Sequence, residues 1–410
     1  MLTQTKYLLS DCDLGEEEAQ AVADVVRSKW LSVGPRTAEF EAAFAAFLAD
    51  PAENPGAEIH AVSVSNCTAA LHLALLAVGV GPGDEVLVPS YTFVASANAV
   101  LYCGATPVFV DIAGPHDLNL DVADLEAKIT PKTRAVVAVH MCGFPVDLDR
   151  IMALSEAHGF KVVEDACHAI GARYAGDRSG PTASAFRGRA AGTIGHAGCF
   201  SFFANKNLVT GEGGMVVTRD PDIARYARLG RSHGMTKTSW DKAKGRATGY
   251  DVVQPGFNYR GTELTAALGL VQLRKLPAAN ARRRDLVARY RERLADAGLP
   301  LSVPFAGRLD DSAHHVFAVL VDATERVAPF REALDGRGVQ TTHHYPPVHT
   351  FSHFRRAAAG GGDVGVDALP RTIDASAREV TLPLHPLLAD DDVDQIVSRV
   401  SDCLASTVSG

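Results

Sequence analysis

From about residue 60 onward, short apolar runs alternate with segments of helical pattern. The apolar runs are continuously hydrophobic, which is typical of strands buried on both faces of a parallel sheet. The predicted strands are 61–64, 85–89, 106–111, 134–140 and 161–165, and the predicted helices lie from 68 onward, at 93–102, near 121–129 and at 151–159. This βαβα order predicts a large α/β domain with a right-handed parallel core.

The second half of the chain predicts two further strands and a smaller domain. The strands are 199–203 and 213–218, with a glycine-rich segment at 211–214 between them. An arginine-rich helix from about 273 to 297 is predicted to lead into the smaller unit. A small α+β unit is predicted from the apolar run 314–322, a helix near 325–336 and the segment 339–345. Residues 357–366 are predicted to form a flexible loop. We therefore divide the chain into 1–275, an N-terminal segment plus the large α/β domain, and 276–410, the connector helix plus a small α+β domain.

Composition and charge exclude several classes of protein. The chain has 410 residues, with 40 Lys and Arg against 48 Asp and Glu, so its formal charge is −8. A mildly acidic chain without a basic run is a poor candidate for nucleic-acid binding. The longest apolar stretch, 69–80, is too short to span a bilayer. No signal peptide is expected from the first residues, and we expect a cytoplasmic protein.

Cysteine and histidine spacing gives no sign of a metal site. The seven cysteines are odd in number and contain no C-x-x-C pair, so neither a disulfide framework nor a thiolate zinc site is expected. Six histidines cluster late in the chain, without the spacing of known zinc motifs: His314, His315, His343, His344, His349 and His353. We predict no metal.

Three local patterns could carry chemistry, and each also has a plain structural interpretation. Cys67 and Thr68 follow Asn66 at a predicted helix start, which favours an anion or is an ordinary helix cap. Asp165 ends a predicted strand, where it could hold a cationic group of a ligand or cap the next turn. Lys206 lies between an aromatic run and glycines, where desolvation would lower its pKa, or it is a solvated loop lysine.

The order of these patterns resembles the fold type I enzymes that use pyridoxal 5′-phosphate (PLP), and more narrowly the DegT/DnrJ/EryC1/StrS family of sugar aminotransferases. The resemblance covers nearly the whole chain, and the motifs in this order are highly specific. They are WLSVGPRTAEFE (30–41), SNCTAALHLALLA (65–77), PSYTFVASANAV (89–100), VEDACHAIGA (163–172), FSFFANKNLVTGEGG (200–214), FNYRGTELTAALG (257–269) and HHYPPVH (343–349). The resemblance implies a large, mostly parallel-sheet domain and a smaller C-terminal α+β domain.

The resemblance also implies roles for residues around the cofactor ring. Lys206 matches the lysine that joins PLP as a Schiff base and then acts as general base and acid. Asp165 matches the carboxylate that pairs with the pyridine nitrogen and keeps the ring an electron sink. His168 matches a position near the ring hydroxyl, and Phe93 matches the residue that stacks on the ring face.

A phosphate site and a shared dimer site follow from the same resemblance. The amides around Cys67 and Thr68, with the Ser201 hydroxyl, match the phosphate donors. Asn258 matches a residue that reaches the phosphate from the partner subunit, which implies a homodimer with shared active sites. The family usually has glycine where this chain has Cys67. Backbone amides still bind phosphate there if the residue keeps a negative φ.

The implied activity is transfer of an amino group from L-glutamate to a keto-sugar, and we favour a nucleotide-linked 3- or 4-keto-6-deoxyhexose. A keto-cyclitol acceptor with glutamine as donor stays open. In a dehydratase of the same fold the lysine is typically histidine, so Lys206 argues against that class. A non-catalytic PLP-binding regulator is the third class, and the set of Lys206, Asp165 and Ser201 argues against it.

Two long segments depart from the family pattern, 176–192 and 236–254. The second contains four basic residues, Lys237, Lys242, Lys244 and Arg246. This segment could meet a substrate pyrophosphate or could be a solvated surface loop, and the sequence supports both interpretations equally.

Overall fold

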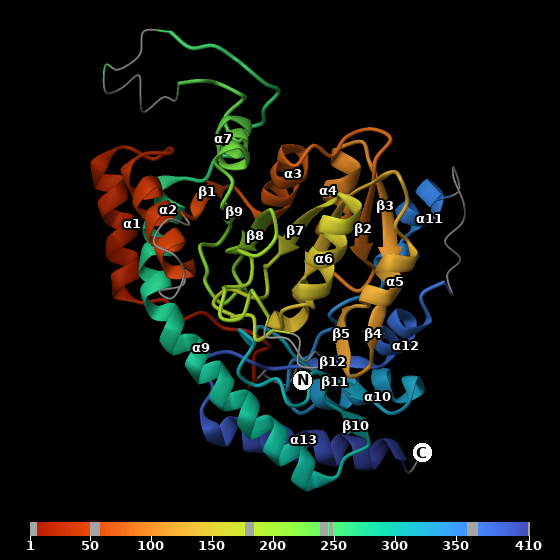
Figure 1. Cartoon of the computed structure of the whole chain (residues 1–410). Helices are drawn as coiled ribbons and strands as arrows, with labels where there is room; N and C mark the ends of the chain where they lie inside the picture. Colours follow the sequence, from red (N-terminus) through yellow and green to blue (C-terminus); the bar gives the residue numbers. More distant parts are fainter. Residues whose placement is uncertain are drawn as a thin grey trace.

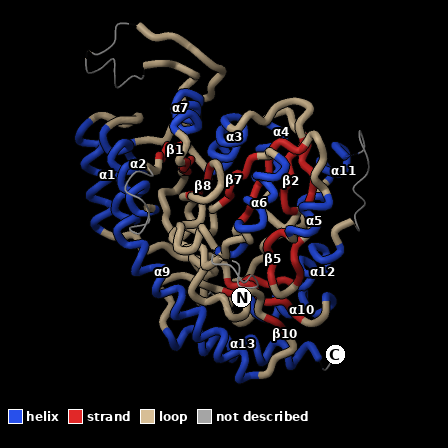
Figure 2. The backbone as a smooth tube through the Cα atoms, in the orientation of Figure 1, coloured by secondary structure: helices blue, strands red, loops and turns tan. Residues whose placement is uncertain are grey.

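A seven-stranded sheet forms the centre of the computed structural model (Figures 1 and 2), which describes residues 6–49, 58–176, 184–237, 245, 249–358 and 368–408. The strand order is β1-β9-β8-β7-β6-β2-β3. Its strands are β1 (His60–Val64), β2 (Glu85–Pro89), β3 (Thr106–Val110), β6 (Thr133–Val139), β7 (Lys161–Asp165), β8 (Ala197–Ser201) and β9 (Gly214–Thr218). β9 is antiparallel to both neighbours, and the other neighbouring pairs are parallel. The predicted mostly parallel α/β fold is confirmed.

Helices cover both faces of this sheet, which explains the continuous hydrophobicity of its strands. One face packs against α3 (Cys67–Ala77), α4 (Ala95–Tyr102) and α7 (Pro221–Gly230), and the other against α5 (Val122–Ala127) and α6 (Leu148–His158). Successive side chains of β2 alternate between these two cores. Val86 and Val88 belong to the core with α3 and α4, and Leu87 belongs to the core with Leu125 and Ile151.

A third group of helices lies at the β1 end of the sheet: α1 (Glu16–Ser28), α2 (Pro35–Leu48) and the long α9 (Glu263–Ala297). α2 and α9 share a hydrophobic core with side chains of β1, β8 and β9. Thr262 caps α9 by accepting a hydrogen bond from the Thr265 N–H, so the helix begins ten residues before the predicted start. The helix ends at Gly298, whose positive φ of 58° suits glycine. The predicted domain boundary at 275 falls inside this helix. No helix in the described ranges combines the length and hydrophobicity needed to cross a bilayer.

The C-terminal part forms a small antiparallel sheet, β10 (Leu301–Ser302), β11 (Phe317–Val321) and β12 (Glu379–Leu382), beside the hairpin of β4 (Ile112–Gly114) and β5 (Asp117–Leu120). Its helices are α10 (Thr324–Asp335), α11 (Ser352–Ala358), α12 (Pro370–Arg378) and α13 (Asp390–Val408), and two short 3-10 turns are η1 (Met141–Gly143) and η2 (Val348–Thr350). β11 and α10 match the prediction closely. Residues 339–345 form no strand in the described structure and make only isolated bridges. All but the first two residues of the predicted loop 357–366 lie outside the described residues.

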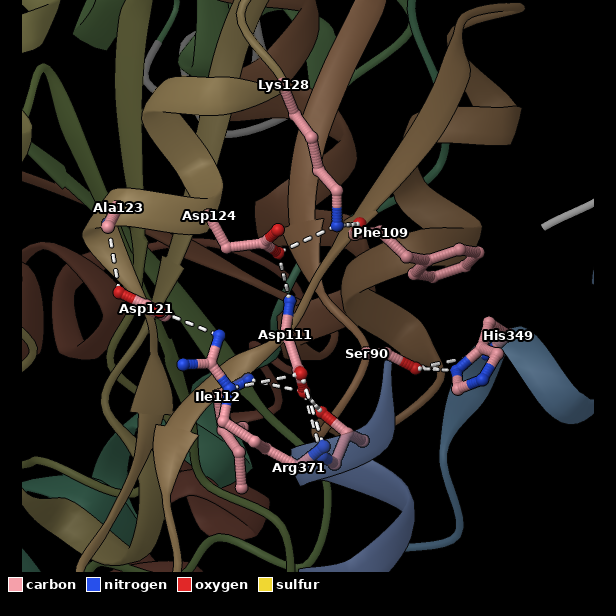
Figure 3. A network of polar contacts seen from close by, with 11 residues as sticks. Ser90, Phe109, Asp111, Ile112, Asp121, Ala123, Asp124, Lys128, His349 and Arg371 are labelled. Atoms are coloured by element: carbon pink, nitrogen blue, oxygen red, sulfur yellow. Dashed lines mark hydrogen bonds and ion pairs between the residues drawn. The ribbon is translucent and has the colours of Figure 1, made fainter. Parts of the chain in front are cut away.

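Asp111, directly after β3, joins the large sheet to α12 (Figure 3). Its Oδ1 accepts hydrogen bonds from the Thr372 amide (2.7 Å), the Thr372 hydroxyl (2.6 Å) and the Ile112 amide (2.9 Å), and Oδ2 accepts from Arg371. Burial alone would raise the pKa of this carboxyl, but these donors lower it. A buried carboxylate therefore caps α12 and connects the two parts of the chain.

A second set of contacts positions the segment that carries Tyr345. The Glu379 carboxyl of β12 accepts hydrogen bonds from the His344 amide (2.9 Å) and the Thr381 hydroxyl (2.5 Å). The Ser90 hydroxyl, just after β2, is 2.6 Å from His349 Nδ1 (Figure 3). Burial raises the pKa of Glu379 to about 8. The segment is thus held from both parts of the chain.

We expect Asp111→Asn to lower the free energy of unfolding by about 3 kcal/mol, because the substitution removes a buried, hydrogen-bonded charge. Urea unfolding at neutral pH measures this loss. The control is Asp374→Asn on the same helix, whose side chain is 55% exposed and pairs with Arg378; it should cost less than about 1 kcal/mol. Because the folded pKa of Asp111 is lowered, its contribution is present above the ordinary value of 3.8 and is lost as the pH falls. Equal losses for both variants would contradict the assigned role.

Glu379 should make stability fall as the pH rises. Its folded pKa lies above the ordinary value of 4.5, so the unfolded chain ionises first and stability is lost between pH 4.5 and about 8. We expect the difference in unfolding free energy between wild type and Glu379→Gln to change by up to about 1.4 kcal/mol per pH unit in that window. Urea unfolding at several pH values tests this slope. Glu332→Gln, on exposed α10 surface, should leave the slope unchanged.

Candidate cofactor site

The candidate site lies at the carboxyl ends of the central strands, where ligands gather in open α/β sheets. Asp165 is the last residue of β7, Ser201 is the last residue of β8, and Cys67 is the first residue of α3. Ligand atoms of Cys67, Asp165 and Cys167 lie within 4.8 Å of one another, and the Asp165 carboxylate acts electrostatically on the Lys206 amine. The structure therefore brings together side chains from three of the sequence motifs.

The first turn of α3 offers backbone donors. The Asn66 side chain caps the helix by accepting from the Ala69 amide at 2.9 Å, and helix geometry leaves the Cys67 and Thr68 amides without an intrahelical acceptor. Cys67 is not among the residues with positive φ. A Cβ on Gly214 would lie 2.5 Å from the Asn66 carbonyl carbon, so only glycine lets β9 begin this close to the helix. The cap that the sequence suggested and a free anion site therefore coexist.

Asp165 is buried and held by two donors. The Ser96 hydroxyl donates to Oδ2 at 2.8 Å, and the Cys167 amide donates to Oδ1 at 3.2 Å. Ser96 is in turn 3.0 Å from the Thr92 hydroxyl. A carboxylate with two donors has acceptor capacity left for a cationic group. Sequence reasoning missed Ser96, which lies one residue inside α4 and gives no signal of its own.

A chain of hydrogen bonds orients His315 toward Lys206. The Asn207 amide nitrogen donates to the Ala313 carbonyl (2.7 Å) and to Asn280 Oδ1 (3.0 Å), so Asn207 Oδ1 faces His315. His315 Nδ1 lies 3.1 Å from that oxygen and must carry the proton. His315 Nε2 therefore presents its lone pair to Lys206 Nζ, 3.2 Å away. The sequence prediction contained neither His315 nor Asn207 as site residues.

Burial determines the protonation of this group. Desolvation lowers the pKa of Lys206, although the Asp165 carboxylate opposes the effect. Desolvation also lowers the pKa of His315 and of His168 well below 6.5, and the Lys206 charge lowers both further. Both imidazoles are therefore neutral at neutral pH, and Lys206 has a larger neutral fraction than a solvated lysine. Lys206 is half-buried and contacts His315, which favours the desolvated interpretation over the solvated loop lysine.

His168 keeps one ring nitrogen available. Its Nε2 lies 3.0 Å from the Tyr345 hydroxyl, and its buried Nδ1 has no partner among the described residues. The Phe93 ring, 56% exposed, lies 5.9 Å from the Tyr345 ring. Tyr345 belongs to the predicted motif 343–349 but was assigned no role. It connects that motif to the site through His168.

Glu164, the neighbour of Asp165 on β7, supports the site from the opposite face of the sheet. Its carboxylate is fully buried and accepts from His140 Nε2 (2.9 Å) and from the amides of Gly192 (2.7 Å), Ile194 (2.8 Å) and Gly195 (2.6 Å). The amides fix the turn that precedes β8, and β8 carries Ser201. The sequence contains this residue as part of VVED, but only the fold shows its partners.

Asn258 makes no direct contact with this group, although its neighbour Tyr259 accepts a hydrogen bond from the Ser65 amide at 2.8 Å, two residues before Cys67. Asn258 is exposed and forms an isolated bridge with Ser232, and none of its contacts in the described structure reaches Lys206 or Asp165. Lys237 is exposed, and Lys242, Lys244 and Arg246 lie outside the described residues. Residues 177–183 of the other long segment also lie outside them.

Three of the six clustered histidines, His343, His344 and His349, lie within hydrogen-bond distance of hydroxyl groups, whereas His314 Nε2 lies 2.7 Å from the Leu309 carbonyl oxygen. His343 lies 3.0 Å from the Ser376 hydroxyl, and His344 lies 2.9 Å from that of Thr381. In the described part of the chain, the group whose ligand atoms lie within 4.8 Å of one another is Cys67, Asp165 and Cys167. These three side chains belong to the candidate cofactor site.

Comparisons with known proteins identify the family and the fold. The sequence model of the DegT/DnrJ/EryC1/StrS aminotransferase family matches residues 12–401. The spore coat polysaccharide biosynthesis protein SpsC of Bacillus subtilis (strain 168) is 39% identical over 397 residues, 95% of each chain. The crystal structure of the aminotransferase TlmJ from Streptoalloteichus hindustanus has a TM-score of 0.84 and 36% identity, covering 98% of this chain and 100% of its own. Spr1654 of Streptococcus pneumoniae, solved in a PLP form, has a TM-score of 0.84 and 29% identity, covering 97% and 98%.

Proposed function

This chain belongs to the DegT/DnrJ/EryC1/StrS aminotransferase family, and from that premise we propose that it moves an amino group from L-glutamate to a keto-sugar with the aid of PLP. The favoured acceptor is a nucleotide-linked 3- or 4-keto-6-deoxyhexose. The observation that carries the proposal is the desolvated Lys206 amine, held beside a buried carboxylate at the carboxyl edge of the sheet. A regulator that only binds a cofactor has no need of an amine in this state.

The residues present fit PLP, on which this family depends. The first turn of α3 and the Ser201 hydroxyl suit a phosphate, and Gly214 leaves room beside that turn. Asp165 suits a protonated ring nitrogen. The unpartnered Nδ1 of His168 suits a hydroxyl or phenolate oxygen, and Phe93 offers an exposed aromatic face. Each chemical feature of the cofactor thus has a candidate partner in the chain.

When bound, PLP supplies an electron sink for the carbon that gains or loses the amino group. Asp165 would keep a proton on the ring nitrogen by electrostatic attraction, and the Ser96 hydroxyl fixes the carboxylate in place. Cys67 and Thr68 would bind the phosphate through their amides, with Ser201 as a hydroxyl donor. These groups position the ring, and none of them has to move a proton.

Lys206 carries the proton transfer in this proposal. With PLP bound, Lys206 would be the residue that holds the cofactor, and its partly neutral amine would be the group that moves a proton at the reacting carbon. The lone pair of His315 Nε2, 3.2 Å away, orients the amine by accepting its N–H. Asn207 fixes the tautomer that makes this possible. The same amine serves both half-reactions.

The acceptor is the least constrained part of the proposal. A nucleotide-linked sugar carries a pyrophosphate, and the exposed Lys237 at the start of the basic segment suits that anion. A keto-cyclitol with glutamine as donor is the alternative, and it needs no basic segment. A cytoplasmic location is part of the proposal, because the seven cysteines are odd in number and contain no C-x-x-C pair.

We also propose a homodimer with shared sites. The described parts of segment 236–254 expose large apolar side chains, with Tyr250 55%, Val252 54% and Val253 53% accessible. Asn258, close by in the chain, is exposed, and its neighbour Tyr259 accepts a hydrogen bond from the Ser65 amide near the start of α3. If a second copy covers these side chains, Asn258 of one chain would reach the phosphate site of the other chain. We therefore propose three partners: a second copy of this chain, the keto-sugar and the amino donor. Binding to nucleic acid or to a membrane is not part of the proposal.

Lys206→Ala should abolish amino transfer and leave a folded protein that still binds PLP without a covalent bond. Borohydride reduction of the PLP-loaded wild type should fix the cofactor on Lys206, as peptide mass spectrometry would show. The control is Lys161→Ala at the opposite end of β7, which should retain both activity and labelling. Reduced cofactor on any other lysine would refute the assignment.

Mixed dimers test the shared site. Asn258→Asp should nearly abolish activity, because a carboxylate would face the phosphate. When Lys206→Ala and Asn258→Asp dimers exchange subunits, one site of each hybrid carries both substitutions and the other carries neither. Random mixing makes half of the dimers hybrids with one of two sites intact, so activity should return to about a quarter of wild type. Absence of recovery, despite proven exchange, would place Asn258 in its own chain's site or outside the site altogether.

A further inference from the structure

Two thiols meet inside the candidate cofactor site, and the proposed reaction uses neither. Cys67 is the first residue of α3, and Cys167 follows Asp165 by two residues, 100 positions away along the chain. The Cys167 thiol donates a hydrogen bond to Cys67 Sγ at 2.8 Å. A disulfide bond is about 2.05 Å long, so the two sulfur atoms need to approach each other by less than about 1 Å. They are therefore close enough to be joined.

We propose that Cys67 and Cys167 are an oxidative modification site, which a small-molecule disulfide or peroxide converts to a disulfide that excludes the cofactor phosphate. The exclusion rests on the proposed function, whereas the disulfide itself does not. This reaction adds a covalent, reversible modification to a site otherwise devoted to amino transfer.

The reaction is balanced with either oxidant. With a small-molecule disulfide, one protein thiolate attacks a sulfur and expels a thiolate, and the second protein thiolate attacks the mixed disulfide and expels the other. Two protein thiols are oxidised and the reagent is reduced to two thiols. With hydrogen peroxide, the first thiolate becomes a sulfenic acid and releases hydroxide, and the second thiol displaces water. The net products are one disulfide and two water molecules.

Burial sets the conditions for this reaction. It raises the pKa of Cys67 to about 12 and also raises that of Cys167, with the Lys206 charge opposing both shifts. Since the thiolate is the reactive form, oxidation should accelerate as the pH rises above neutral. At neutral pH the pair is stable as thiols under reducing conditions and responds to sustained oxidant.

The backbone of both cysteines contributes to the candidate site. The Cys67 amide is one of the two free donors at the start of α3, and the Cys167 amide donates to Asp165 Oδ1 at 3.2 Å. Drawing the sulfur atoms together displaces at least one of these amides. The two effects are thermodynamically linked. If the disulfide weakens PLP binding by a given factor, bound PLP must lower the equilibrium constant for disulfide formation by the same factor.

The experiment exposes the full-length apoprotein and the PLP-loaded protein to hydrogen peroxide, and separately to oxidised glutathione, across pH 7 to 9. Non-reducing peptide mass spectrometry should find Cys67 linked to Cys167, faster at higher pH and slower with PLP bound. PLP uptake, followed by absorbance, should fall at least tenfold on linkage and return with a phosphine reductant. Cys12→Ser, outside the pair, should behave like wild type. Cys167→Ser and Cys167→Ala, each compared with its own untreated form, should lose the oxidant sensitivity of PLP uptake.

Three results would overturn the proposal. In the first, no linked peptide forms in the apoprotein even though Cys12 is oxidised. In the second, the linked protein takes up PLP normally. In the third, uptake returns with a chelator and without reductant, which would mean that a metal ion on Cys67, Cys167 and Asp165 is the inhibitor. If the untreated protein takes up no PLP, the proposed function fails, and the linked peptide still confirms or refutes the disulfide.

Discussion

The site depends on holding the Lys206 amine out of water without leaving a buried, unpaired charge. A buried ammonium is costly, and the protein reduces that cost by lowering the pKa of the amine and by offering it the lone pair of His315. Asp165 lies close enough to act on the amine electrostatically, and the Ser96 hydroxyl and the Cys167 amide hold its carboxylate in place. The amine is therefore desolvated, oriented and not neutralised by a direct ion pair.

The sheet and its supports follow from this requirement. Parallel strands converge their carboxyl ends, so Asp165 and Ser201 reach the same edge that α3 approaches. Glu164, on the other face of β7, fixes the turn before β8 through three amides. The small sheet contributes through Glu379, which holds the segment of Tyr345, and Tyr345 reaches His168. The large sheet thus positions Asp165 and Ser201, and the small sheet helps to position His168.

The sequence predicted those features that leave a local pattern. Continuous apolar runs predicted the parallel strands, because both faces of the sheet are covered by helices, and the motif order led to Lys206 and Asp165. The first ten residues of α9 were missed because their alanine-rich, apolar sequence lacks the arginine pattern used to recognise the rest of the helix. Ser96, Asn207 and His315 were missed because their roles arise from contacts between distant segments. A lone serine or histidine carries no signal of such a partner.

Single-turnover amination tests the central claim most directly. Protein loaded with pyridoxamine phosphate is mixed with each member of a panel of nucleotide-linked keto-sugars and keto-cyclitols, and the amino product is quantified by mass spectrometry. Our account predicts that wild type aminates a nucleotide-linked keto-6-deoxyhexose, about one product per chain, and that Lys206→Ala forms none in the same time. Amination of a keto-cyclitol alone, or equal yields from wild type and Lys206→Ala, would contradict it.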